Sequence, residues 1–256
     1  MGGRAWTAMP RFLIVSDIHA NLTAFEAVLA AAQGRWDQAV CLGDVVGYGP
    51  DPNETIARVV SLGITTIRGN HDKTGAGLED SDSFNPVARA AVDWTQARLS
   101  PENLRWLREL PPGPLVRDGL VFVHGALDDE DEYVFSAEVA ARGLRASPSP
   151  ITLFGHTHVQ GGFLMRNDLV ETLRPPLRPG AGFLALALED GVRYLLNPGS
   201  VGQPRDGDSR AAFALIDTGR RVFEFWRVPY DVAAVQKRME QAGLPQALVL
   251  RLAFGR

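Results

Sequence analysis

Five short apolar runs in the chain are each followed by polar side chains of the kinds that bind metal ions. Together these positions hold all five histidines of the chain. In α/β sheets the carboxyl ends of parallel strands converge on one crevice, so residues far apart in the sequence can meet there. The runs are FLIV, AVCL, TTI, LVFV and TLF, and the residues that follow them are Asp17 and His19, Asp44, Asn70 and His71, His124, and His156 and His158.

The length and composition favour one folded domain. With 256 residues, 45% of them hydrophobic, the chain can bury a core of the size found in a single α/β or all-β domain. We therefore expect one domain over residues 1–256. The first strand pattern begins only after Pro10, so residues 1–9 are expected to form a flexible tail. The sequence contains neither a secretory signal nor an apolar stretch of membrane-spanning length, which predicts a cytoplasmic protein without membrane contact.

The charge and the cysteine content exclude several kinds of partner and site. A formal net charge of -4 gives no broad basic surface, so we expect no binding to long nucleic acid, and any anionic substrate must be attracted locally. The single cysteine, Cys41, excludes an internal disulfide and is expected in the core. A metal site must therefore use histidine, asparagine and carboxylate side chains.

The order of elements predicts an α/β architecture. Apolar patterns predict strands at 11–16, 38–43 and 64–68, separated by helices at 22–32 and 53–61, the first of them capped by Asn21. Two further helical patterns occupy residues 84–110, with Pro101 at the start of the second. After residue 114 short strands dominate, joined as antiparallel hairpins, and a last helix is expected over 231–242. This order indicates a mixed or double sheet with flanking helices.

A lone histidine near a strand end is more often a hydrogen-bonded structural residue than a ligand. If these histidines, aspartates and the asparagine had only structural roles, chance alone would have to place all of them after five separate strands. Glycines at positions 43, 69, 125 and 155 lie beside the polar residues, where the backbone must turn sharply or approach an ion closely. The combined pattern therefore favours a metal site.

The motifs resemble the ordered signature of the calcineurin-like metallophosphoesterase superfamily. They are Asp17-x-His19, Gly43-Asp44, Gly69-Asn70-His71-Asp72, His124-Gly125 and Gly155-His156-Thr157-His158. The later segment NPGSVGQPRD, residues 197–206, resembles the branch of small bacterial and archaeal phosphodiesterases. The resemblance implies an α/β fold in which a sandwich of two β-sheets is flanked by α-helices.

The resemblance also implies a centre of two divalent metal ions. It assigns Asp17, His19, Asp44 and His158 to one ion, and Asp44, Asn70, His124 and His156 to the other. A carboxylate is the side chain that can offer an oxygen to both ions, which agrees with a bridging Asp44. Mixed nitrogen and oxygen ligation suits Mn, Fe, Co, Ni or Zn, and the resemblance implies manganese.

The expected activity is that of a phosphodiesterase that hydrolyses small phosphate esters or nucleotides by attack of a metal-bridged hydroxide. His71 follows Asn70 but is assigned to neither ion. It is the candidate catalytic residue, which would stabilise the transition state or protonate the leaving oxygen, oriented by Asp72 or Asp17. The alternative for His71 is structural support of the ligands.

The sequence is also compatible with other functions for the chain. The chain could be an interaction scaffold of the same fold that lost catalysis, an amide hydrolase, or a pyrophosphatase of nucleotide conjugates. Asn197, Ser200 and Arg205 either present polar groups beneath the site or belong to a turn that packs against it. The acidic run at 128–132 is expected to be a solvated loop that repels long polyanions. The oligomeric state, including a homo-oligomer, is open.

Overall fold

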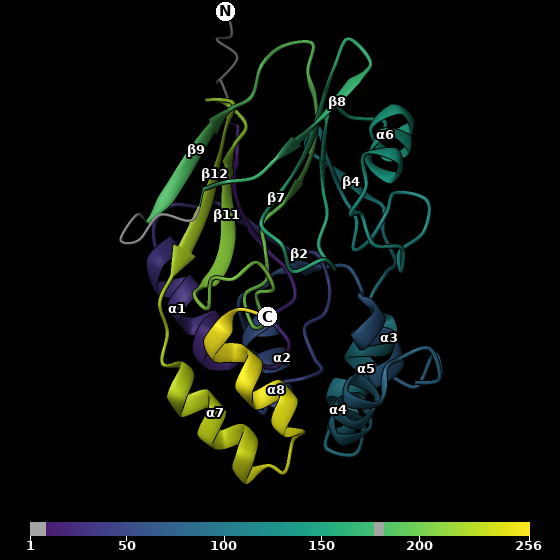
Figure 1. Cartoon of the computed structure of the whole chain (residues 1–256), viewed down its shortest axis with the longest axis vertical. Coiled ribbons are helices and arrows are strands. Elements are labelled where there is room, and N and C mark those ends of the chain that lie inside the picture. The colour runs from purple at the N-terminus through teal and green to yellow at the C-terminus, as the bar shows by residue number, and fades with distance from the viewer. Residues whose placement is uncertain (1–8, 177–181) are drawn as a thin grey trace, which may run out of the picture.

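The computed structural model describes residues 9–176 and 182–256. Two six-stranded sheets pack face to face and are flanked by helices (Figure 1). The strand order of the first sheet is β3 (Thr65–Thr66), β2 (Gln38–Cys41), β1 (Arg11–Val15), β11 (Ala211–Asp217), β12 (Val222–Val228) and β9 (Phe183–Ala187). That of the second is β4 (Leu115–Arg117), β5 (Leu120–Phe122), β6 (Ile151–Leu153), β10 (Arg193–Asn197), β7 (Gly161–Arg166) and β8 (Leu169–Leu173).

Both sheets are mixed. In the first sheet β1, β2 and β3 are parallel to one another, and β1 pairs with β11 in antiparallel register. In the second sheet β5, β6 and β10 are parallel, and the outer strands pair antiparallel. The predicted α/β double sheet with flanking helices is confirmed.

The helices follow the strands in the order α1 (Leu22–Ala32), α2 (Pro52–Ser61), α3 (Asn70–Gly75), α4 (Pro86–Gln96), α5 (Pro101–Glu109), α6 (Ala137–Ala146), α7 (Val232–Gln241) and α8 (Gln246–Arg251). The predicted cap of α1 is confirmed, because the Asn21 side chain accepts a hydrogen bond from the backbone N–H of Ala24. Three helices differ from the sequence prediction, two of them with only six residues. We expected no helix at α3 or α8, and α6 lies in a stretch where we expected strands to dominate.

Side-chain alternation in β1 shows how the layers form. Phe12 and Ile14 face the second sheet, whereas Leu13 and Val15 pack toward α1 on the other side. Cys41 lies in the same helix-facing core, as predicted. Helix α6 covers the outer face of the second sheet. In the first sheet the central strands β1, β2 and β11 are buried on both faces, which suits their nearly continuous apolar sequences.

The helices gather mainly at one end of the sandwich. Figure 1 shows α3, α4 and α5 at the same end as α7 and α8, which are drawn in yellow. Residues of α4, α7 and α8 share a core with the buried Tyr48, which lies in the loop after β2. Among residues 9–176 and 182–256, no helix is long and apolar enough to cross a membrane. Residues 1–8 of the expected tail lie outside the described residues, and Met9 is exposed.

Candidate metal centre

Two groups of buried donor side chains meet at the ends of the parallel strands. Their candidate ligand atoms lie within 4.8 Å of one another in each group. Asp44 belongs to both groups, and the Oδ1 atom of Asn70 lies 3.3 Å from Nε2 of His124. The structure thus brings together all seven predicted ligands. The first group is Asp17, His19, Asp44 and His158, and the second is Asp44, His124 and His156.

Backbone carbonyls determine which nitrogen each histidine presents. The Nδ1 atoms of His19, His124 and His158 donate to the carbonyl oxygens of Val46, Leu42 and Gln203 at 2.9, 2.8 and 2.6 Å. Because a carbonyl only accepts, each Nδ1 carries a proton, and Nε2 is the nitrogen that each of these rings turns toward the other candidate ligands. His156 is reversed, since its Nε2 donates to the carbonyl oxygen of Asp131 and leaves Nδ1 available.

Two of these Nε2 atoms face each other directly. The Nε2 atoms of His19 and His158 are 3.1 Å apart, and two lone pairs at that distance need a proton or a cation between them. Oδ2 of Asp44 lies 3.6 Å from Nε2 of His19 and 3.5 Å from Nε2 of His124. This oxygen and Oδ2 of Asp17 are buried and accept no hydrogen bond. The donor set therefore fits divalent cations, since buried carboxylates must be paired or coordinate metal.

Burial sets the protonation of the centre. It lowers the pKa of His19 and of His158 well below the usual value, and that of His156 to about 3, so these rings are neutral. Burial also acts to lower the pKa of His124, but the Asp44 carboxylate outweighs it and raises that pKa to about 9. Neutral imidazole is the form that binds metal, and the raised pKa of His124 shows that Asp44 favours positive charge beside it.

The backbone is strained where it presents the ligands. Asp17, His19, Asp44, His156 and His158 all have φ between 49° and 64°, in the left-handed region. Such a conformation costs about 1–2 kcal/mol for each non-glycine residue and is concentrated at functional sites. Gly69 permits a close approach to a candidate ligand, because a Cβ there would lie 2.2 Å from Oδ1 of Asp44.

Asp72 fixes the Asp44 loop and does not orient His71. Its Oδ2 accepts from the backbone N–H groups of Asp44 and Gly69, and its Oδ1 from those of Val45 and Val46. The expectation that Asp72 orients the ring of His71 is therefore wrong, since its oxygens are occupied by backbone donors. Asp17 makes no hydrogen bond to His71 either, among the contacts of the described residues.

Aromatic contacts hold the ring of His71 instead. The ring stacks on Phe84 with centroids 4.7 Å apart, lies 4.3 Å from the ring of Tyr48, and meets His19 edge-on at 4.8 Å. Burial lowers the pKa of His71 to about 4. A Cβ at Gly47 would lie 2.4 Å from Nδ1 of His71, which is buried without a hydrogen-bond partner. His71 thus lies beside the first donor group and belongs to neither.

The segment 197–206 both packs against the site and supports it. Nδ2 of Asn197 donates to the carbonyl oxygen of Gly155 at 2.8 Å, and the hydroxyl of Ser200 donates to that of Asp17 at 2.8 Å. These two polar side chains therefore hold the backbone of the segments that carry the candidate ligands. Arg205 differs, because its Nη2 donates to the hydroxyl of Tyr48 and to Oε1 of Gln203.

The acidic run at 128–132 is partly an ion-paired wall of the site, which corrects the expectation of a solvated loop. Lys73 of α3 is only 2% exposed, and its Nζ donates to Asp131 at 2.6 Å and to Glu79 at 3.1 Å, and pairs with Glu130 at 3.2 Å. The carbonyl of Asp131 in turn holds His156. Sequence reasoning missed Lys73, because nothing in a single lysine signals partners more than 50 residues away.

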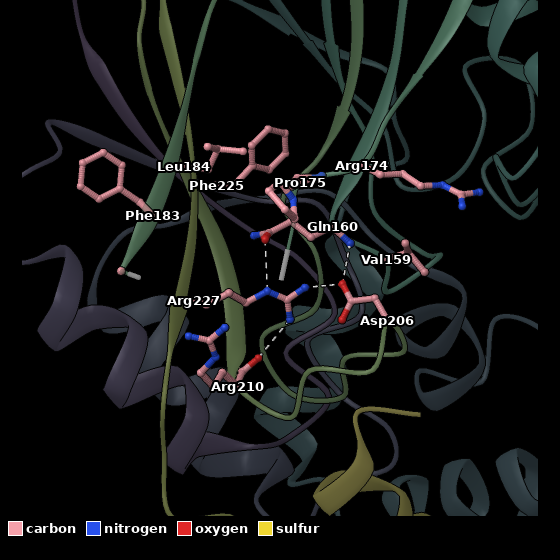
Figure 2. A pocket seen from close by; sticks show the side chains of 12 residues that line it. Val159, Gln160, Arg174, Pro175, Phe183, Leu184, Asp206, Arg210, Phe225 and Arg227 are labelled. Carbon is pink, nitrogen blue, oxygen red and sulfur yellow. Dashed lines mark hydrogen bonds and ion pairs between the residues drawn. The ribbon is translucent and has the colours of Figure 1, made fainter. Parts of the chain in front are cut away.

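A separate cavity of about 260 Å³ lies between the ends of β8, β9 and β12 (Figure 2). None of its lining residues belongs to the two donor groups. Arg227 is buried in its wall and donates to Oε1 of Gln160, to the carbonyl of Arg210 and to the carboxylate of Asp206. This network ties β12 to the loop that follows β10.

Comparisons with known proteins agree with this geometry. Residues 11–221 match the calcineurin-like phosphoesterase superfamily domain. The chain is 31% identical to the protein MJ0912 of Methanocaldococcus jannaschii over 95% of this chain and 97% of that protein. Its structure is similar to that of a metallophosphoesterase from Sphaerobacter thermophilus, with a TM-score of 0.82 and 41% identity over 98% of this chain and 100% of the other.

The fold also matches that of the hypothetical protein PH1004 from Pyrococcus horikoshii, with a TM-score of 0.78 and 20% identity over 96% of this chain and 98% of that one. At this identity the likeness shows the fold alone. The family match covers most of the chain and includes every residue of the two donor groups. The protein therefore belongs to the calcineurin-like phosphoesterase superfamily.

Proposed function

We propose that the protein is a phosphodiesterase with a binuclear metal centre that hydrolyses small phosphate esters or nucleotides. Membership in the superfamily implies a hydrolase of phosphate esters, and the clustered Asp and His side chains can bind metal. The observation that carries the proposal is the pair of donor groups that share Asp44, together with the unsatisfied carboxylate oxygens between them.

In this proposal Asp17, His19, Asp44 and His158 hold one ion, and Asp44, Asn70, His124 and His156 hold the other. When bound, two divalent ions would supply positive charge to the phosphate and activate water for attack on phosphorus. Nitrogen and oxygen donors without sulfur suit Mn, Fe, Co, Ni or Zn, and we propose manganese.

The remaining chemistry belongs to side chains of the chain itself. His71 lies 4.8 Å from the His19 ring, so it can donate a hydrogen bond to a phosphoryl oxygen or hold a proton at the leaving oxygen. Buried Asp17 and Asp44 reduce the positive charge of the ions without cancelling it, which attracts an anionic ester although the net charge of the protein is negative.

The complete donor groups favour an enzyme over an interaction scaffold. A scaffold would have no need to hold five ligand residues in strained left-handed backbone, since strain persists where the surrounding structure maintains it for function.

The substrate panel that tests the proposal uses protein stripped of metal and then reloaded with Mn²⁺. The substrates are bis(p-nitrophenyl) phosphate, p-nitrophenyl phosphate and a nucleotide pyrophosphate. We expect kcat/KM for the diester to exceed that for the monoester by about tenfold or more, because a tenfold ratio corresponds to only about 1.4 kcal/mol of transition-state binding. A preference for the monoester, or cleavage of the pyrophosphate alone, would contradict the diester assignment. No turnover of any substrate would favour the scaffold.

A further inference from the structure

Two arginines beside the metal centre share one neutral acceptor. Oε1 of Gln203 accepts from Nη2 of Arg205 at 3.2 Å and from Nη1 of Arg251 at 3.2 Å. The two guanidinium groups are therefore neighbours. Neither makes an ion pair with a carboxylate in the part of the chain that the structure describes.

The carboxylates nearest to Arg205 in the sequence pair with other groups. Asp206 follows Arg205 directly, but its carboxylate accepts from Arg227 and from the backbone N–H of Gln160, as Figure 2 shows. Asp208 pairs with Arg210 at 2.5 Å. The two acidic residues that follow Arg205 in its loop thus pair with other arginines and not with Arg205.

Donors without acceptors remain around this pair. Nε of Arg205 and Nε2 of Gln203 are buried and have no hydrogen-bond partner among the described residues. The Gln203 amide cannot be rotated to relieve this, because its oxygen is the acceptor that both arginines use. Two like charges and two unsatisfied donors in a partly buried place cost free energy that a bound anion would offset.

The pair lies one contact away from the candidate ligands. The backbone carbonyl of Gln203 accepts from Nδ1 of His158, and Arg205 donates to the hydroxyl of Tyr48, whose ring lies 4.6 Å from that of His19. Both arginines are partly exposed, so an anion can reach them from solvent. An anion held there would be adjacent to a phosphate bound at the metal centre.

The second arginine comes from outside the matched family domain. That match ends at residue 221, whereas Arg251 is the last residue of α8. Leu248 and Val249 anchor α8 in the core that contains Tyr48, which positions Arg251 beside the centre. The C-terminal helices therefore add a basic group that the family domain by itself does not contribute.

We propose that Arg205 and Arg251 bind a second phosphate of the substrate, so that the preferred substrates are small phosphate esters with another phosphate next to the one at the metal centre. The guanidinium fork binds phosphate oxygens in pairs, which suits this role better than a lysine would. That the bound anion is a second phosphate of the substrate rests on the proposed function. That Arg205 and Arg251 bind an anion does not depend on it.

The test measures binding to the Mn²⁺-loaded protein by calorimetry, with inorganic phosphate and methylenebisphosphonate as probes. We expect the wild type to bind the bisphosphonate at least about tenfold more tightly than phosphate, equivalent to about 1.4 kcal/mol. Arg251→Gln should remove most of that preference, and Arg251→Lys should keep part of it. Arg256→Gln is the matched control, because it removes an exposed arginine of the same C-terminal segment and should keep the wild-type ratio.

Metal content measured before and after each titration shows whether the chelating probe extracts Mn²⁺, and melting curves show whether the variants fold. The proposal would be overturned if folded Arg251→Gln kept the wild-type ratio of bisphosphonate affinity to phosphate affinity. An equal loss of affinity for both probes would overturn it as well. Binding needs no turnover, so the two proposals fail separately. A protein that prefers the bisphosphonate but cleaves no ester would keep the anion site and lose the proposed function.

Discussion

At the residue scale, the two oxygens of Asp44 have different partners. Oδ1 accepts from the backbone N–H of His71 at 2.9 Å, whereas Oδ2 faces Nε2 of both His19 and His124 and accepts no hydrogen bond. Oδ1 thus fixes the orientation of the side chain, and Oδ2 is available to bind a cation. The contact of Oδ1 with the backbone of His71 also fixes the position of the proposed bridging ligand relative to the candidate catalytic residue.

Replacing His71 separates a catalytic role from a ligand role. In His71→Ala we expect metal content to stay at the wild-type value, because His71 lies in neither donor group. We expect kcat to fall by about 10²- to 10⁴-fold, the usual effect of losing a positioned proton donor. The measurements are elemental analysis and kcat on esters of graded leaving-group pKa.

The leaving-group series distinguishes the two roles proposed for His71. A defect that grows with leaving-group pKa indicates proton donation to the leaving oxygen, and a constant defect indicates stabilisation of the phosphoryl oxygens. Loss of a metal ion in the variant, or wild-type turnover of every ester, would contradict both roles.

The sequence could predict which residues meet but not how each is held. Polar residues after apolar strands converge because strand ends converge, so the positions of Asp17 and His158 follow from the pattern. The role of Asp72 could not be foreseen, because three of its four backbone partners lie in residues 44–46 and meet it only in the folded chain. The arginine pair was missed for the same reason, since Arg205 and Arg251 meet only through the packing of α8.

At the element scale, α3 and the acidic loop form one wall of the site. Lys73 joins them with contacts to Glu79, Glu130 and Asp131, and the carbonyl of Asp131 holds His156. The helix has only six residues, too few to show an apolar period in the sequence. Helix α6 was missed for a different reason, because its interior Gly143 lowers the helix propensity of the segment.

Removing the Lys73 amine tests whether this wall positions His156. Lys73→Met should lower the free energy of unfolding by about 1.5–3 kcal/mol, the usual worth of hydrogen bonds to charged groups, and should weaken metal binding. The control is Arg142→Gln, which removes an exposed cation that pairs with Asp128 and Glu132 of the same loop. The measurements are denaturant unfolding and metal titration.

The control should unfold and bind metal as the wild type does. Equal effects of the two substitutions would show that general loop charge matters rather than the buried contact. Unchanged metal affinity in Lys73→Met would show that His156 is held without help from α3.

At the scale of the whole molecule, the double sheet brings the strand ends together and the C-terminal helices close one side. Strand periodicity and helix signals in the sequence predicted most strands and most helices, because local patterns determine them, whereas the sandwich of two sheets was implied by the family resemblance. Which strands are neighbours depends on long-range pairing, such as β1 beside β11, and could not be read from local patterns. One domain over residues 1–256 and a cytoplasmic location remain predictions.

The central claim is that one chain holds two metal ions and that Asp44 binds both. The most direct measurement titrates Mn²⁺ into chelator-stripped protein and follows bound metal per chain together with phosphodiesterase activity. We expect two ions per chain, activity that requires both, and a loss of both in Asp44→Asn, because removing a shared ligand weakens each ion. Full turnover by the stripped protein in excess EDTA, a single ion at saturation, or an Asp44→Asn variant that keeps two ions would contradict the account.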